Sequence, residues 1–252
     1  KNIDLSGKDL SFSNFHYAHF DNSNLEGANL QGATLIQVDF TKVKNKSLAG
    51  ANLFDTSLAH SFLSGVNLTD TILKGTNFWK ADLSGQDFTV IADTSADGIT
   101  FIETNLSNSN FEGVDMSPQQ IFYNIFKDKA YLVSGSFVDG SLKDDLFGKF
   151  SHILILSGKV NGNDLVVSYV FFNSFAQANL ENANFKNAKL WHTNFYLANL
   201  TNADLSGADL RKAFIRNADF SNANLEGANL SGAIWDESTI LKCKNHPICL
   251  ND

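Results

Sequence analysis

The chain has little of what catalytic, metal-binding and membrane proteins are built from. Its 252 residues include only two cysteines and two prolines. No G-x-G-x-x-G, P-loop, H-E-x-x-H, G-x-S-x-G or paired C-x-x-C motif occurs. Apolar runs such as 153–156 are far shorter than the roughly 18 residues that a membrane helix needs. We therefore expect no membrane insertion, no metal, no cofactor and no enzymatic activity.

Positive charge is also scarce. The chain has 19 Lys and Arg residues against 27 Asp and Glu residues, which gives a net charge of −8. Simple attraction to nucleic-acid phosphates or anionic lipid is therefore disfavoured, and we expect no direct binding of nucleic acid. Most of the negative charge belongs to residues 1–116, so the two halves of the chain differ in charge.

The two cysteines, Cys243 and Cys249, both lie in the C-terminal tail. Their spacing favours a small disulfide loop, with free thiols as one alternative. A metal site with His246 is a second alternative, but two thiols and one imidazole leave a tetrahedral ion one ligand short. A disulfide would favour an exported protein over a cytoplasmic one. The start at Lys1 fits either a removed segment or a fragment of a longer chain.

An apolar residue recurs at every fifth position from 160 to 240. Helices need a period of 3.6 residues and strands a period of 2, so neither element explains seventeen consecutive matches. A smaller residue, mostly Ala, stands two positions before each apolar centre, and Asn or Asp usually stands between the two. Alternating large and small side chains can fill a narrow tube, while Asn and Asp bond readily to nearby backbone in turns.

The pattern A-(D/N)-L-x-x, as in Ala203-Asp204-Leu205-Ser206-Gly207, resembles the pentapeptide-repeat family. Repeats of this kind cover 5–40, 48–88, 101–116, 132–147 and 160–240. The resemblance implies an all-β fold, a right-handed quadrilateral β-helix in which four repeats form one coil. The repeats then predict a solenoid of about ten coils.

Breaks in the period divide the chain into four parts. We expect an N-terminal β-helix at 1–116, an interrupted region at 117–159, a regular β-helix at 160–240 and a C-terminal cap at 241–252. In the interrupted region, Ser117-Pro118 and the following apolar residues predict a short helical insertion. One continuous stack is favoured over two, because the repeat resumes quickly on both sides. Solenoid ends need covering, so the uncapped N-terminal end predicts either a preceding segment or a homodimer.

Residues twenty positions apart should lie on one face, one coil away from each other. This rule places Phe171, Trp191 and Arg211 in one outward column, and Tyr196, Arg216 and Asp236 in the adjacent column. Phe171, Trp191, Tyr196, Arg211 and Arg216 form a candidate binding patch, because aromatic and Arg side chains are enriched at interface hot spots. The alternative is a local cation–π contact between Trp191 and Arg211. Phe54, Phe62 and Trp79 also fall at outward positions, where inserted segments could cover them.

The favoured function is a non-catalytic structural or protein-interaction module, because a solenoid offers long rigid faces to a partner. The partner itself is not identified by the sequence. Family resemblance implies an alternative, a DNA-mimic protein that binds DNA gyrase or topoisomerase. A third hypothesis is the β-helical part of a secreted effector.

Overall fold

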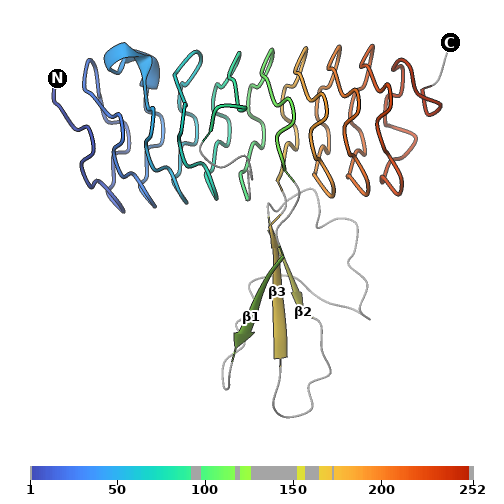
Figure 1. The fold of residues 1–252 in the computed structure, drawn as a ribbon, viewed down its shortest axis with the longest axis horizontal. Coiled ribbons are helices and arrows are strands. Elements are labelled where there is room, and N and C mark those ends of the chain that lie inside the picture. The colour runs from blue at the N-terminus through green and yellow to red at the C-terminus, as the bar shows by residue number, and fades with distance from the viewer. Residues whose placement is uncertain are drawn as a thin grey trace.

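The computed structural model describes residues 2–91, 98–116, 120–125, 152–156, 165–171 and 173–249. Most of them form a rod of stacked coils, with the two chain ends at opposite ends of the rod (Figure 1). No helix within these ranges has the length and apolar character that crossing a bilayer requires.

The rod is a four-sided solenoid whose coils are joined by isolated parallel bridges. We number its faces by the apolar centres of the first coil: Leu5, Leu10, Phe15 and Phe20. On the third face one bridged column runs without a break along the rod, through Asn14, Thr34, Ser57, Asn77, Thr100, Ser174, Asn194, Phe214 and Ile234. These nine residues mark nine coils, against the roughly ten expected from the repeats.

The sequence pattern maps directly onto the coil. Apolar centres and the small residues before them point inward and are buried from the second coil to Ala228, whereas the Asn and Asp residues between them lie at the bridges. Near the C-terminal end, the centre Trp235 is 50% exposed. Their carboxamide or carboxylate Oδ1 accepts the backbone N–H two residues later, as in Asp204 with Ser206 at 3.0 Å. The amide Nδ2 of Asn224 also donates to Asp204 one coil away, over 3.1 Å. Turn chemistry and coil stacking therefore use the same side chain.

Phenylalanine stacks form the centre of the core. On the third face, the rings of Phe101, Phe175 and Phe195 stack in parallel, with centroids 5.0 and 5.1 Å apart. On the first face, Phe111 and Phe185 stack at 4.8 Å. Rings of the two stacks meet edge to face, an arrangement that aromatic pairs favour. The core is therefore continuous from residues before the insertion to residues after it.

The middle of the chain leaves the solenoid and returns to it without interrupting the stack. The coil that contains Thr100 is bridged directly to the coil that contains Ser174, and Asp115 is bridged to Lys189. The rod is thus one continuous stack, which is the arrangement that the sequence favoured.

Three strands lie in this middle segment: β1 (Gln120–Ile125), β2 (His152–Leu156) and β3 (Leu165–Phe171). They form an antiparallel sheet in the order β1-β3-β2, drawn beside the middle of the rod in Figure 1. The helix expected after Pro118 is therefore wrong for residues 120–125, which are strand. Capping signals favoured a helix there, but strand pairing satisfies the backbone of a segment as well as a helix does.

The five-residue period also predicted the wrong core positions at two places in 160–240. Leu165 and Val170, expected as coil centres, belong to β3, because a β-branched strand can match a period of five by chance. Near the other end, Leu241 is buried and Ile240 is exposed, because one extra residue shifts the register after Trp235. The repeats expected at 132–147 and at position 160 lie outside the described residues.

Short elements complete the rod. The break in the repeats at 41–47 contains two single-turn 3-10 helices, η1 (Phe40–Lys42) and η2 (Lys44–Lys46). At the C-terminal end, Lys244 is bridged to Asn224 of the last coil, and the side chains of Ile248 and Cys249 pack against the core. The described part of the tail thus covers the last coil, as expected.

Candidate functional site

Each repeat ends in a two-residue turn at a corner of the solenoid, and the second turn residue has a left-handed backbone conformation. Gly and Asn adopt this conformation at least cost. Corners that follow the first and fourth faces mostly use them, for example Gly27 (φ 66°), Gly85 (φ 68°) and Asn202 (φ 59°). The left-handed position of such a turn therefore carries no large side chain.

The corner that follows the third face departs from this rule. Its second turn residues have φ between 54° and 59°, yet none is glycine and one is asparagine: Tyr17, Gln37, His60, Lys80, Glu103, Gln177, Leu197 and Asn217. A left-handed conformation costs an ordinary L-residue roughly 1–2 kcal/mol. Residues held at such a cost often serve a function, so this corner is the first candidate site.

The first turn residues of the same corner are apolar in six consecutive coils: Ile36, Ala59, Trp79, Ile102, Ala176 and Tyr196. We call these six residues the apolar corner. Backbone hydrogen bonds fix their alignment, because the N–H of His60 donates to the carbonyl of Trp79 and the N–H of Glu103 donates to that of Ala176. At the other corners, the equivalent positions are mostly Ser, Thr, Glu and Gln.

Trp79 is the largest side chain of the apolar corner and is held in place on several sides. Its indole N–H donates to Oε1 of Glu103 over 3.2 Å, the ring of His60 meets it edge-on at 4.9 Å, and Nζ of Lys80 lies 4.9 Å from its centroid. Even so, Trp79 remains 39% exposed. A fixed, accessible indole can bind a partner with little loss of rotamer freedom.

The charges next to Trp79 compensate each other. Nζ of Lys80 lies 3.2 Å from Oε2 of Glu103. The hydrogen bond from Trp79, followed by the bond and charge of Lys80, lowers the pKa of the Glu103 carboxyl. Glu103 therefore stays ionised as the partner of both side chains.

The structure separates the patch that stacking by twenty had grouped. Tyr196 belongs to the apolar corner and Arg216 continues the same corner in the next coil, whereas Trp191 and Arg211 lie at the corner that follows the second face. Phe171, expected in the Trp191 column, is instead in β3 and is paired with His152. The column fails there because the chain is outside the solenoid at that point.

The corner of Trp191 and Arg211 is occupied by local contacts. The guanidinium of Arg211 forms a bidentate pair with Asp209, at 2.8 and 2.7 Å, which lowers the pKa of that carboxyl. The ring of Trp191 meets His192 edge-on at 4.4 Å. Burial, and then the charge of Lys212, lower the pKa of His192. Half-buried and locally paired, these groups make a weaker candidate than the apolar corner.

Tyr196 and Arg216 enclose Phe214. This residue stands just before an apolar centre, at a position that is usually Asn or Asp, yet it is only 5% exposed. The guanidinium carbon of Arg216 lies 5.6 Å from the Phe214 centroid, and the Tyr196 ring lies 6.1 Å from it. Nε of Arg216 is 3.8 Å from Asp236. This cluster lies at the C-terminal end of the apolar corner.

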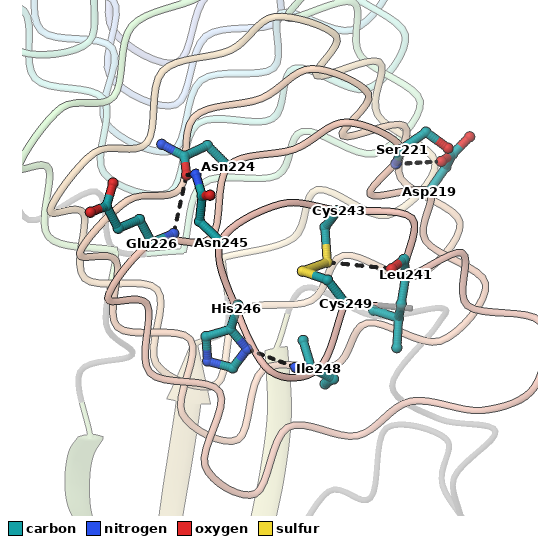
Figure 2. Close-up of a disulfide and its surroundings, with 10 residues drawn as sticks. All are labelled: Asp219, Ser221, Asn224, Glu226, Leu241, Cys243, Asn245, His246, Ile248 and Cys249. Atoms are coloured by element: carbon teal, nitrogen blue, oxygen red, sulfur yellow. Dashed lines mark hydrogen bonds between the residues drawn. A yellow bond between two sulfur atoms is a disulfide. The ribbon is translucent and has the colours of Figure 1, made fainter. Parts of the chain in front are cut away.

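The described part of the C-terminal tail contains a disulfide. Sγ of Cys243 and Sγ of Cys249 are 2.13 Å apart, and Nδ1 of His246 accepts the N–H of Ile248 over 3.2 Å (Figure 2). His246 is thus engaged by backbone. Within the described ranges, no group of three or more His, Cys, Asp or Glu side chains could hold a metal ion.

Sequence reasoning missed most of the apolar corner. It singled out Trp79 and Phe62 as outward residues that inserted segments could cover, but they are 39% and 53% exposed. Three extra residues in the loop of η1 and η2 lengthen the spacing between neighbouring coils there from twenty to twenty-three, as in Thr34 to Ser57. Stacking by twenty-three across this loop would have aligned Ile36 with Ala59.

Comparisons with known proteins agree with this fold. A family model described as pentapeptide repeats matches eight copies, over residues 3–44, 48–89, 178–217 and 198–234, which is more than half of the chain. No curated protein matches the sequence at a significant level.

Solved structures of the same fold are similar at low identity. HetL, a pentapeptide repeat protein involved in heterocyst differentiation regulation from the cyanobacterium Nostoc sp. strain PCC 7120, is 22% identical over 96% of this chain and 84% of its own, with a TM-score of 0.40. QnrB1, a plasmid-mediated fluoroquinolone resistance protein, is 15% identical over 93% and 92%, with a TM-score of 0.30. From the match of the family model, the chain belongs to the pentapeptide-repeat family.

Proposed function

We propose that this protein is a non-catalytic interaction module that binds a protein partner through the apolar corner. The observation that carries the proposal is the composition of that corner. Six consecutive coils have an apolar first turn residue there, although Ala59 and Ala176 are buried, and the adjacent left-handed positions avoid glycine. Neither feature is needed for coil formation, because the corners after the first and fourth faces form the same turns mostly with polar first turn residues and with Gly or Asn at the left-handed position.

The chemistry of the corner suits a protein surface. An exposed Trp and a half-buried Tyr are typical of interface hot spots. At the coil spacing of about 4.8 Å, six coils give an apolar line about 24 Å long. Lys80 and Glu103 compensate each other within the chain, so covering this corner would not bury an unpaired charge.

The distribution of acidic side chains supports a DNA mimic less well than an interaction module. Along the first face, the position just before each apolar centre is occupied in turn by Asp4, Asn24, Ser47, Asn67, Asp87, Asn110, Asn184, Asp204, Asn224 and Lys244. Acidic residues are therefore separated by several coils, whereas duplex DNA carries one charge for every 1.7 Å or so of its axis. Many of the carboxylates also accept hydrogen bonds from Asn, as Asp82 does from Asn105. This spacing favours the interaction module over the mimic.

Site-directed photo-crosslinking tests the proposal. Benzoylphenylalanine replaces Trp79 in one protein and Ser84 in another; Ser84 is the matched control, at the equivalent turn position of the next corner in the same coil. Irradiation in extracts of the source organism should give a crosslinked protein from position 79 and none from position 84. Trp79→Ala should weaken the interaction by about 30-fold. Equal crosslinking from both positions, or none from position 79, would remove the proposal.

A further inference from the structure

We infer that the partner presents an arginine side chain beside the apolar corner, where its guanidinium stacks on the ring of Phe62 and bonds to the carboxylate of Asp82. The inference rests on the proposed function, because Trp79 of the apolar corner lies next to this site, and it names the chemistry of the partner. Its basis is an exposed aromatic ring next to a carboxylate that pairs with no cation in the described part of the chain.

Two neighbouring coils form the site on the fourth face. Phe62 is bridged to Asp82 in the next coil, and residues bridged in this way are about 4.8 Å apart. Phe62 follows His60 by two residues, and the ring of His60 meets that of Trp79 at 4.9 Å. Asp82 follows Trp79 by three residues. The exposed ring, the carboxylate and the indole therefore share one stretch of surface.

Phe62 does not stabilise the turn that follows it. The residue just before an apolar centre usually accepts the backbone N–H two residues later, and Asp39 and Asp82 do so over 3.0 and 3.1 Å. The side chain of Phe62 has no acceptor for the N–H of Ser64, and 53% of it is exposed. A large, half-exposed ring that replaces a turn hydrogen bond is better explained by binding than by folding.

The carboxylates on the two sides of Phe62 differ in their partners. Asp39, one coil before, has Oδ2 2.8 Å from Nζ of Lys42. Asp82, one coil after, accepts a neutral hydrogen bond at Oδ1 from Nδ2 of Asn105 over 2.9 Å. Within the described ranges, no Lys or Arg side chain lies within ion-pair distance of Asp82. Its negative charge is therefore left uncompensated.

The uncompensated carboxylate sets the chemistry of the partner. An interface of ordinary size, about 800 Å² on each side, would cover Asp82 together with Trp79. Burying a carboxylate is costly unless the partner supplies a cation. Arginine suits this site better than lysine, because a planar guanidinium can stack on an aromatic ring and bond to a carboxylate at the same time. The net charge of −8 also favours the approach of a basic partner.

Fluorescence anisotropy of a fluorescein-labelled hexa-arginine peptide tests the contact on the purified full chain. Phe62→Asn should weaken binding by about 5-fold, and Asp82→Asn should weaken it by about 3-fold. Both substitutions suit the fold, because asparagine supplies an acceptor for the N–H of Ser64 in one case and keeps Oδ1 in the other. Hexa-arginine that binds both variants as tightly as wild type would overturn the inference.

Asp204→Asn is the matched control for the loss of one charge. Asp204 accepts the N–H of Ser206 over 3.0 Å and Nδ2 of Asn224 over 3.1 Å, the same kinds of bond that Asp82 accepts. Its bridged neighbours are asparagines, so no aromatic ring adjoins it there. The control should change hexa-arginine binding by less than about 1.5-fold at physiological salt.

A hexa-lysine peptide separates guanidinium stacking from attraction to the net charge. It carries the same charge as hexa-arginine but no planar group, so it should bind wild type more weakly. Equal binding of the two peptides, or equal weakening by Asp82→Asn and Asp204→Asn, would show attraction to net charge alone and would reject the site.

The two proposals fail separately. If position 79 crosslinks to a protein whose binding is unchanged by Phe62→Asn and by Asp82→Asn, the interaction module stands and the arginine contact is rejected. If position 79 crosslinks to no protein while hexa-arginine binding depends on both residues, the arginine site stands and the apolar corner is rejected as an interface.

Discussion

The carboxamide of Asn173 is bonded to the backbone of Met116, with Nδ2 of Asn173 donating to the Met116 carbonyl over 2.8 Å. Met116 is the last described solenoid residue before the sheet insertion, and Asn173 is the first after it. Oδ1 of Asn173 also accepts the N–H of Ile99, in the preceding coil, over 3.1 Å. One buried side chain thus joins the two ends of the insertion to the coil beneath.

Asn173→Leu should destabilise the solenoid by about 1–3 kcal/mol, because the Met116 carbonyl and the Ile99 N–H would lose their buried partner. Denaturant unfolding followed by circular dichroism measures this change. Ser221→Ala, at a turn position of the regular coils, is the control and should change stability by less than about 0.5 kcal/mol. Equal stability of the Asn173→Leu protein and wild type would show that this side chain does not hold the junction.

Phe175→Ala should cost about 3–5 kcal/mol. The Phe175 ring is fully buried and stacks between Phe101 and Phe195, so its removal leaves a cavity in the coils beside the insertion. Phe175→Leu refills much of that volume and should recover most of the loss. Thermal unfolding of the two variants against wild type measures both effects, and similar losses in both would argue against the cavity explanation.

The solenoid itself was predictable from the sequence because each of its forces acts locally and repeats. Leu205 is buried by the coils above and below it, and Asp204 accepts a hydrogen bond in the turn of its own repeat. A single five-residue repeat therefore specifies both the core packing and the turn. The insertion was less predictable. Its strands pair across long sequence distances, as Gln120 with Val170, and no local signal specifies such a partner.

The candidate site was predictable only in part, for a geometric reason. Tyr196 and Arg216 were found because regular coils of twenty residues separate them. Ile36 and Ala59 were missed because the loop between their coils adds three residues, and Ala176 because the sheet insertion precedes it. Outward residues leave no trace in the core pattern, so only the coil-to-coil hydrogen bonds show which of them share a corner.

Replacing different turn glycines by alanine should destabilise the solenoid to different degrees. Gly75 and Gly85 both have left-handed backbones, with φ of 72° and 68°, but a Cβ on Gly75 would collide with the carboxylate of Asp55, whereas a Cβ on Gly85 would meet nothing. Gly85→Ala should therefore cost about 1 kcal/mol from backbone conformation alone, and Gly75→Ala should cost more. If urea unfolding gives equal losses for both, the collision with Asp55 has no energetic consequence.

The disulfide should stabilise the C-terminal end more than the rest of the rod. Reducing a bridge with a sequence separation of 6 should cost about 2 kcal/mol, mainly because the unfolded tail gains freedom. Coils contact only their neighbours, so the loss should remain local. Hydrogen exchange after Cys243→Ser and Cys249→Ser substitution should rise at 236–249 and stay unchanged near Thr34. Faster exchange along the whole rod would contradict local coupling.

Leu197→Gly separates stability from binding at the corner that carries the apolar residues. Leu197 is left-handed, with φ of 57°, and 45% exposed, so it carries conformational strain and its side chain is only partly buried. Glycine removes roughly 1–2 kcal/mol of strain and loses part of this gain through greater freedom of the unfolded chain. The variant should thus be more stable by about 0.5–1 kcal/mol, measured by urea unfolding, while it binds its partner more weakly. A variant that gains stability and binds as well as wild type would show that Leu197 is not retained for binding; one that loses stability would show that its side chain contributes to the fold.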